Sequence, residues 1–430
     1  MAQSMIPIPV VKRELDLFET SRMQINYDHF RWERISPING CTDPLEFHIT
    51  GSGDNYIWPQ MHYLHLWLKI TQNNGDNLLP ADQTTPVNNF AHSLWNEVKV
   101  TINGTVVTPK DENYAYKAFF ERLFSFGDCA MKSQGEAALF IKDVAGQMEH
   151  QVNNTGAAAR RRYIAQSKVV EMMCPLNVDL FLQGQVLPNG CDISVKLTRN
   201  PVQFSLMMPD NNGRVISITK SDLLIAKPRL NPATFVAHAN AFQQGAMAIY
   251  PIRRCETRTA VIERGLLSKT LANICTGQLP RRVVVGLVSN TAYNGARDEN
   301  PFNFKHYDLN YIALHLDGEL RPNLPLTPNF TDDLYLQSYM SLFLATDKLN
   351  RDEGLTVTRS DYSQGYALYA FDLSADQSSD ATHFDTIKSG NFKIDLKFAR
   401  GTPHSINVVI RLEFDSTIRI DRSKTVILDY

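Results

Sequence analysis

Short runs in which apolar and polar residues alternate recur along the chain. The period of two is clear in Tyr63–Ile70, Glu97–Ile102, Asp192–Arg199, Tyr311–Leu316 and Lys393–Arg400. Alternation sends successive side chains to opposite faces of a strand, so each run predicts a β-strand with one buried face. Turn residues separate the runs, and helical patterns are few. We therefore expect an all-β fold of antiparallel strands.

Two of these predicted strands lead directly into a tight turn. Asn103-Gly104 follows the strand that ends at position 102, and Asp317-Gly318 follows the strand that ends at position 316. Asn, Asp and Gly tolerate the positive φ angles that a two-residue hairpin turn requires. The four residues are therefore predicted to be structural hairpin turns.

The same hairpin occurs in both halves because the sequence contains an internal repeat. Asn89–Ile102 and Asn303–Leu316 both begin with Asn-Phe-x-His and continue into the strand, at a constant offset of 214 residues. Upstream, Trp58-Pro59 and Leu279-Pro280 each lead into a strand at an offset of 221 residues. The drift in offset places insertions in loops. A repeat of about half the chain predicts two similar domains.

A helical pattern follows the hairpin in each half, so a helix is expected at the same point of both domains. The residues at helical spacing are Tyr116, Phe119, Phe120, Leu123 and Phe124 in the first half and Leu334, Tyr335, Ser338, Tyr339 and Leu342 in the second. Asn231-Pro232 predicts the start of another helix over Ala233–Gln244. The polar segment Lys142–Arg162, which includes Arg160-Arg161-Arg162, is expected to be an exposed loop.

Short strands, few helices and roughly 200 residues per repeat are typical of an antiparallel sandwich or barrel such as the jelly roll. We expect two tandem eight-stranded jelly-roll β-barrels with short inserted helices. The expected division is an N-terminal arm over residues 1–24, a first jelly roll over 25–220 and a second over 221–430.

Composition is that of a folded protein without membrane spans. Apolar residues make up 43% of the chain and charged residues 20%, close to the average for globular proteins. Val283–Val288, one of the more continuous apolar runs, is far shorter than the ~20 residues that cross a bilayer. No signal-peptide pattern opens the sequence. The six scattered cysteines form no C-x-x-C pair, so we expect reduced thiols in a cytosolic or nuclear protein.

Net charge argues against direct coating of a genome. The formal charge is −2, whereas proteins that neutralise phosphates usually carry a basic stripe or tail. Specific nucleic-acid binding is therefore not expected.

Enzyme and metal motifs are missing from the sequence. There is no G-x-S-x-G, phosphate-loop, H-E-x-x-H or cupin metal pattern. His62 and His65 lie in or beside an alternating strand, which favours a half-buried or interface histidine over a metal ligand. Four aspartates lack the glycine and the alternating ligands of a calcium loop and are expected in a solvated loop: Asp372, Asp376, Asp380 and Asp385. We expect no catalysis, metal or cofactor.

Several patches resemble one protein family. The run from Asn89 to Trp95 and the later Gly277–Val283 and Asn300–Phe304 resemble the double jelly-roll major capsid proteins of Polinton-like viruses, adintoviruses and their relatives in the adenovirus–tectivirus lineage. The likeness extends over roughly residues 20–430. It implies a homotrimeric capsomer whose six barrels tile an icosahedral shell around double-stranded DNA, and hence a place in the virion. It also implies a separate single jelly-roll penton protein and minor capsid proteins as partners.

The N-terminal arm carries one candidate assembly element. Val11, Leu15 and Phe18 share one face of a short amphipathic helix. We expect this helix to lie beneath the shell and to tie one capsomer to its neighbours or to an inner layer. The alternative is a helix folded back on its own barrel.

Two other functions fit two β-domains. Jelly rolls also form carbohydrate-binding proteins and glycan hydrolases, whose sites usually combine tryptophans with a carboxylate pair. The four tryptophans, Trp32, Trp58, Trp67 and Trp95, all fall in the first half, and no carboxylate pair stands out. A capsid gene that a host retains for another purpose is the second alternative.

Overall fold

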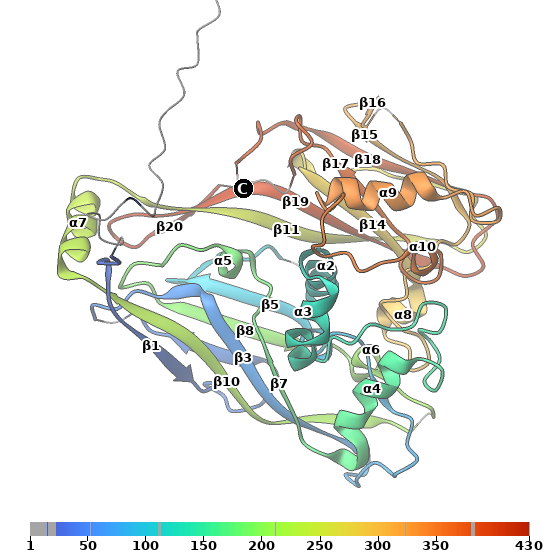
Figure 1. Ribbon diagram of the computed structural model, residues 1–430, viewed down its shortest axis with the longest axis horizontal. Coiled ribbons are helices and arrows are strands. Elements are labelled where there is room, and N and C mark those ends of the chain that lie inside the picture. Colours follow the sequence, from blue (N-terminus) through green and yellow to red (C-terminus); the bar gives the residue numbers. More distant parts are fainter. Residues whose placement is uncertain are drawn as a thin grey trace, which may run out of the picture.

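The computed structural model describes Leu15 and residues 23–51, 53–110, 113–210, 212–322, 324–379 and 383–429. Its main elements are antiparallel sheets arranged as two barrels side by side (Figure 1).

The first barrel consists of two facing four-stranded sheets. One has the order β1 (Tyr27–Ile35), β10 (Arg214–Leu230), β3 (Trp58–Gln72), β7 (Val170–Cys174), and the other has the order β2 (Leu45–Ile49), β8 (Ile193–Arg199), β5 (Trp95–Ile102), β6 (Thr105–Val106). Leu64, Leu66 and Leu68 of β3 are fully buried between the sheets, as the alternating pattern predicts. A two-stranded pair, β4 (Thr85–Pro86) and β9 (Leu206–Met207), lies outside these sheets.

The second barrel repeats this arrangement. One sheet has the order β11 (Ala248–Ile262), β19 (Ile406–Ile420), β14 (Arg282–Ser289), β17 (Leu368–Asp372), with β20 (Val426–Leu428) paired to β19. The other has the order β12 (Ser268–Leu271), β18 (Ser389–Phe398), β15 (Leu309–Leu316), β16 (Glu319–Leu320), with β13 (Thr276–Gln278) also paired to β18.

The strand order identifies both barrels as jelly rolls. When the eight principal strands of either half are numbered in chain order, one sheet joins the first, eighth, third and sixth, and the other joins the second, seventh, fourth and fifth. This is the two-sheet Greek-key arrangement of a jelly roll. The prediction of two tandem eight-stranded jelly-roll barrels is confirmed, and the internal repeat of the sequence is also a repeat of topology.

The predicted helices also recur at one point of each barrel. Helix α2 (Tyr114–Ser125) connects β6 to β7, and α9 (Leu336–Ala345) connects β16 to β17. Two further helices are described below, and the other helical segments are short: α1 (Phe90–Ser93), α3 (Asp128–Lys132), α5 (Asp179–Leu182), α6 (Val202–Ser205), α8 (Asn290–Asn294), α10 (Arg359–Ser363) and the 3₁₀ turns Gln134–Ala138 and Ala165–Ser167.

The barrels are joined by α7 (Pro232–Gln243), at the end of the molecule where β10 finishes and β11 begins (Figure 1). Asn231 caps this helix by accepting a hydrogen bond from the backbone N–H of Ala233. The expected division between residues 220 and 221 falls inside β10, because this strand continues to pair with β1 and β3 beyond that point. The change from one barrel to the other therefore occurs at α7.

The expected exposed loop over residues 142–162 is wrong in its second half. Thr155–Ile164 form α4, and the side chain of Asn154 caps it by accepting from the N–H of Ala157. Arg160 is completely buried. The Asn154 cap and the following alanines favour a helix, which outweighs the loop composition of the segment.

Candidate assembly surfaces

The four predicted hairpin residues lie in equivalent turns of the two barrels. Asn103 (φ 48°) and Gly104 (φ 83°) connect β5 to β6, and Asp317 (φ 51°) and Gly318 (φ 87°) connect β15 to β16. The side chains of Asn103 and Asp317 also bind neighbouring backbone, since Asn103 Oδ1 accepts from the N–H of Asp192 and Asp317 Oδ1 accepts from the N–H of Asn391 in β18. The turns thus fix the ends of both barrels.

Helix α2 lies in the seam between the barrels (Figure 1). Its Tyr114 and Ala118 belong to the core of the first barrel. Its other aromatic residues belong to a cluster shared with the second half, where Phe119 stacks on Phe302 with 4.5 Å between ring centroids. The hydrophobic cluster around them includes Val284 and Val288 of β14. A helix of the first half therefore helps to cover the outer face of the sheet β11–β19–β14–β17, together with α9 of the second half, and every residue of β14 is buried.

Charged groups reinforce this seam. Arg411 of β19 pairs with Glu121 of α2 at 2.6 Å and with Glu413 at 2.8 Å. Burial acts to raise the pKa of Glu413, but Arg282 and Arg411 outweigh burial and lower it to about 2. Glu413 is therefore charged at neutral pH, and the network joins the two halves through fully paired groups.

The corresponding outer face of the first barrel is exposed and aromatic. Tyr27, Phe30, Trp32 and Tyr63 are 36–44% exposed, and half-buried Trp58 lies among them. Their rings contact one another in a chain from Tyr27 to Trp58, Phe30, Trp32 and Tyr63, with centroids 5.7–6.4 Å apart. We call these five residues the aromatic face. It lies on β1 and β3, away from the interior of the barrel.

Helix α9 presents a second exposed apolar surface. Leu336, Met340 and Leu344 are 39–57% exposed and recur every fourth residue, so they share one side of the helix. We call them the α9 row. Ser338, Leu342 and Ala345 on another side are buried against the second barrel.

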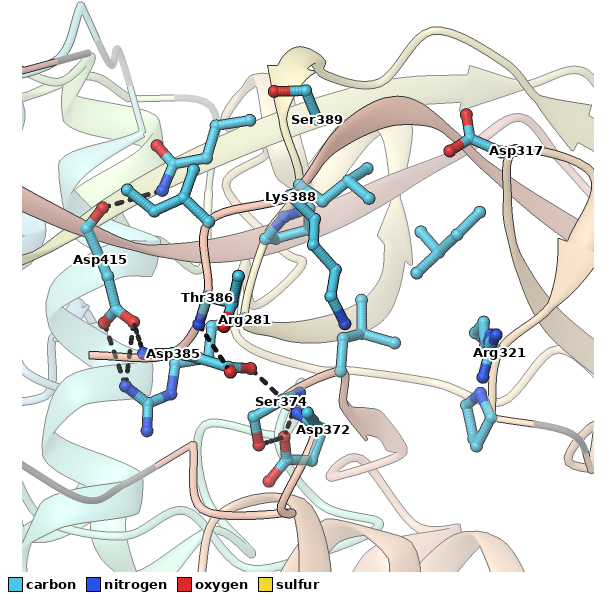
Figure 2. Close-up of a pocket in the computed structure, with 18 of the residues that line it drawn as sticks. Arg281, Asp317, Arg321, Asp372, Ser374, Asp385, Thr386, Lys388, Ser389 and Asp415 are labelled. Atoms are coloured by element: carbon cyan, nitrogen blue, oxygen red, sulfur yellow. Dashed lines mark hydrogen bonds and ion pairs between the residues drawn. The ribbon is translucent and has the colours of Figure 1, made fainter. Parts of the chain in front are cut away.

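A polar pocket of about 780 Å³ opens among the loops of the second barrel (Figure 2). Arg281 binds both oxygens of Asp415 at 3.1 and 3.0 Å, and Asp372 accepts from the N–H and hydroxyl of Ser374. Asp372 is buried, in contrast to the expected solvated loop. The buried charged groups of the pocket thus hold the loops in place. The described residues that line the pocket include no aromatic ring on which a sugar could stack.

The two candidate histidines bind protein groups. His62 Nδ1 donates to the carbonyl of Pro59 and Nε2 accepts from the N–H of Leu176, both at 2.7 Å. His65 contacts Glu171 at 2.7 Å and packs on Trp67. Within the described residues, no group of three or more His, Cys, Asp or Glu side chains is placed to hold a metal. The same part of the chain contains no helix with the length and apolarity needed to span a bilayer.

The arm residues Val11 and Phe18 lie outside the described residues, and Leu15 is 72% exposed. All six cysteines are free thiols.

Sequence reasoning missed the aromatic face as a surface. Phe30 and Trp32, two residues apart, already indicated one face of a strand, and Tyr63 and Trp67 shared a face of another. The pairing of β1 with β3 through β10 brings them together, and the sequence did not specify that pairing.

The chain is similar to known proteins both in sequence and in structure. No family model matches the chain. An uncharacterized protein of Caenorhabditis elegans, F54H12.2, is 26% identical over 425 residues, which span 93% of this chain and 97% of that protein. A chain of the Sputnik virophage superposes with a TM-score of 0.63 and 12% identity, covering 100% of this chain and 94% of its own.

Two viral major capsid proteins have the same fold. The mavirus protein gives a TM-score of 0.54 at 12% identity, with 100% of this chain and 96% of that chain covered. The Faustovirus protein gives 0.57 at 10% identity, with 93% and 92% covered. This chain has the double jelly-roll fold of viral major capsid proteins. These structural matches and the strand order of the chain both support the expected fold class.

Proposed function

We propose that this chain is a major capsid protein, three copies of which form a capsomer of an icosahedral shell. The observation that carries the proposal is the double jelly roll itself, in which two barrels of identical strand order lie side by side across a packed seam. Three such chains supply six similar barrels, and a closed ring of six similar sides packs hexagonally. The solved structures of similar fold include viral major capsid proteins.

The finer assignment follows from the resemblance to Polinton-like viruses and adintoviruses. On this view, many copies of the chain build the shell that encloses double-stranded DNA in the virion, together with a separate penton protein and minor capsid proteins. A formal charge of −2 suits a shell that encloses DNA without binding a particular sequence.

A purely structural role is also part of the proposal. The buried charged groups of the polar pocket are engaged with one another, as a loop support requires. Both ring nitrogens of His62 are engaged in hydrogen bonds to the backbone. No step of catalysis is assigned to either group.

Electron microscopy and light scattering of the purified chain test the proposal. The expected particle is a hexagonal capsomer with three times the chain mass of 48.7 kDa. Particles that remain monomeric across the accessible concentration range, or a closed dimer, contradict it.

The nematode relative gives weight to one alternative, a capsid gene retained by a host, because a nearly full-length relative occurs in an animal. Both readings predict a trimer. They differ in the next step, because a working capsid protein builds closed shells when it is expressed with its penton protein, whereas a repurposed one has no need to.

A further inference from the structure

Equivalent sheets of the two barrels differ in what covers them. The repeat that aligns Trp58-Pro59 with Leu279-Pro280 also aligns Tyr63 and Trp67 of β3 with Val284 and Val288 of β14. Val284 and Val288 are fully buried in the hydrophobic cluster that includes α2, whereas Tyr63 is 36% exposed and Trp67 is only partly covered. The same position in the fold is therefore an interface in one barrel and an open surface in the other.

The exposed sheet has the composition of an interface. Aromatic residues are enriched at protein contacts because they bury large areas at little entropic cost. Five of them form one connected group on the aromatic face. His65 and Trp67, the next outward residues of β3, extend it by packing on each other, and Lys220 of β10 lies 4.5 Å from the Trp67 ring. A solvated sheet face would instead carry scattered polar residues.

The chain itself indicates what covers such a face. In the seam, the helix that the first barrel contributes to this cover is α2, which is inserted between the fifth and sixth principal strands of the first barrel. The helix inserted at this point of the second barrel is α9, and its row of Leu336, Met340 and Leu344 is exposed. The second barrel thus presents the equivalent covering element but has no further barrel in the chain to cover.

We propose that the α9 row of one chain docks on the aromatic face of a second copy. This inference rests on the proposed function and names the surfaces that form the capsomer. The contact repeats between chains the relation that α2 establishes within the chain. It joins two different surfaces, so copies associate head to tail, and a ring that closes after three copies leaves neither surface exposed. Leucine and methionine side chains suit this contact, because they adapt to ring surfaces and sulfur packs favourably beside them.

Three single substitutions test the contact. Trp32→Glu places a charge on the aromatic face, Leu344→Glu places one on the α9 row, and Leu267→Glu is the matched control at an apolar residue that is 59% exposed in the turn before β12. Each removed group is at least 44% exposed in the isolated chain, so all three variants are expected to unfold at the wild-type temperature when every protein, the wild type included, is diluted until it is monomeric. Mass by light scattering over a dilution series gives the association constant. We expect the first two variants to weaken association at least about 30-fold, as for a central interface residue, and the control to remain trimeric.

Mixing the two weakened variants tests the head-to-tail geometry. The Trp32→Glu chain retains an intact α9 row and the Leu344→Glu chain retains an intact aromatic face, so the mixture contains one working contact. A 1:1 dimer that does not grow to a trimer is expected. A mixture that stays monomeric overturns the head-to-tail pairing.

Failure of this inference is distinguishable from failure of the proposed function. If the wild type and both surface variants are trimers of equal stability, the trimer uses other surfaces and only the inference is overturned. If the wild type is a monomer, both are overturned. A monomer that binds a glycan array and loses that binding in Trp32→Glu would assign the aromatic face to carbohydrate instead.

Discussion

Three consecutive arginines meet three different environments because α4 turns by about 100° per residue. Arg160 points into the protein, where it pairs with Asp143 at 2.5 Å and donates to the carbonyl of Pro86 at 2.8 Å. Arg161 is partly buried and Arg162 is exposed. The run of three arginines in the sequence did not reveal that Arg160 is buried, because its partners lie 17 and 74 residues away in the chain.

Replacing Arg160 should therefore destabilise the protein far more than replacing Arg162. Arg160→Ala leaves Asp143 as a buried charge without its main partner, at an expected cost of about 3–5 kcal/mol in the free energy of unfolding. Arg162→Ala is the matched control and should change it by no more than about 0.5 kcal/mol. Urea unfolding of both variants measures the difference. Equal effects would show that the buried pair contributes nothing beyond an exposed arginine.

His62 makes stability dependent on pH. Burial lowers the pKa of His62 to about 4, against 6.5 for an exposed histidine. As the pH falls, the unfolded chain thus takes up this proton before the folded chain does. The contribution of neutral His62 to the free energy of unfolding is therefore complete above pH 6.5 and declines as the pH falls from 6.5 to 4, by up to about 1.4 kcal/mol per pH unit. Burial also lowers the pKa of His92, which acts in the same direction.

The free energy of unfolding of the wild type and of His62→Gln, measured by urea titration at pH 7, 6 and 5, tests this contribution. The variant should be less stable at pH 7 but should lose less stability between pH 7 and 5. Parallel losses in the two proteins would remove His62 as a source of the pH dependence.

At the scale of elements, the strands could be predicted from the sequence, but the elements that pack over their outer faces could not. Alternation gave β3, β5 and β15, because each has one face in a barrel core. Val283–Val288 lacks alternation, and the structure gives the reason: β14 is buried on both faces, by the core of its own barrel and by the seam cluster to which α2 contributes. The unbroken apolar run was therefore a signal of the seam. Its covering helix lies about 160 residues earlier in the chain, beyond the reach of local patterns.

Helix α2 should therefore contribute to the stability of both barrels. Phe119 is 1% exposed and stacks on Phe302 of the other half. Phe119→Ala should lower the free energy of unfolding by about 3–5 kcal/mol, since it opens a cavity in the seam. The exposed Ser125→Ala in the same helix should have little effect. Hydrogen exchange should show faster opening of β14 as well as α2 in the Phe119 variant; loss confined to the first barrel would mean that the seam does not couple the halves.

For the whole molecule, the repeat predicted two barrels, and their identical strand order follows from it. The relation between them depends on the seam, whereas the junction lies at α7 rather than at residue 220 because β10 stays paired within the first barrel. Tyr250 and Ile418 of the second half pack into the first core, so β11 and β19 extend past their own barrel. Such long strands bind the halves into one unit. A domain boundary assigned from sequence position alone misses these contacts of β11 and β19 with the first core.

The N-terminal arm provides the last prediction, which concerns assembly rather than folding. Removing residues 1–22 leaves β1, which starts at Tyr27, complete, and the side chain of Leu15 is 72% exposed. If the arm ties capsomers together, the truncated chain should form trimers of normal thermal stability that fail to build shells under conditions in which the full chain does. A chain of full length in which Val11, Leu15 and Phe18 are replaced by serine controls for length and should fail in the same way, because the apolar side of the helix makes the tie. Light scattering reports the trimer and electron microscopy reports the shell. Unfolded truncated protein would instead indicate a helix folded back on its own barrel, and normal shells from both variants would show that the arm takes no part in assembly.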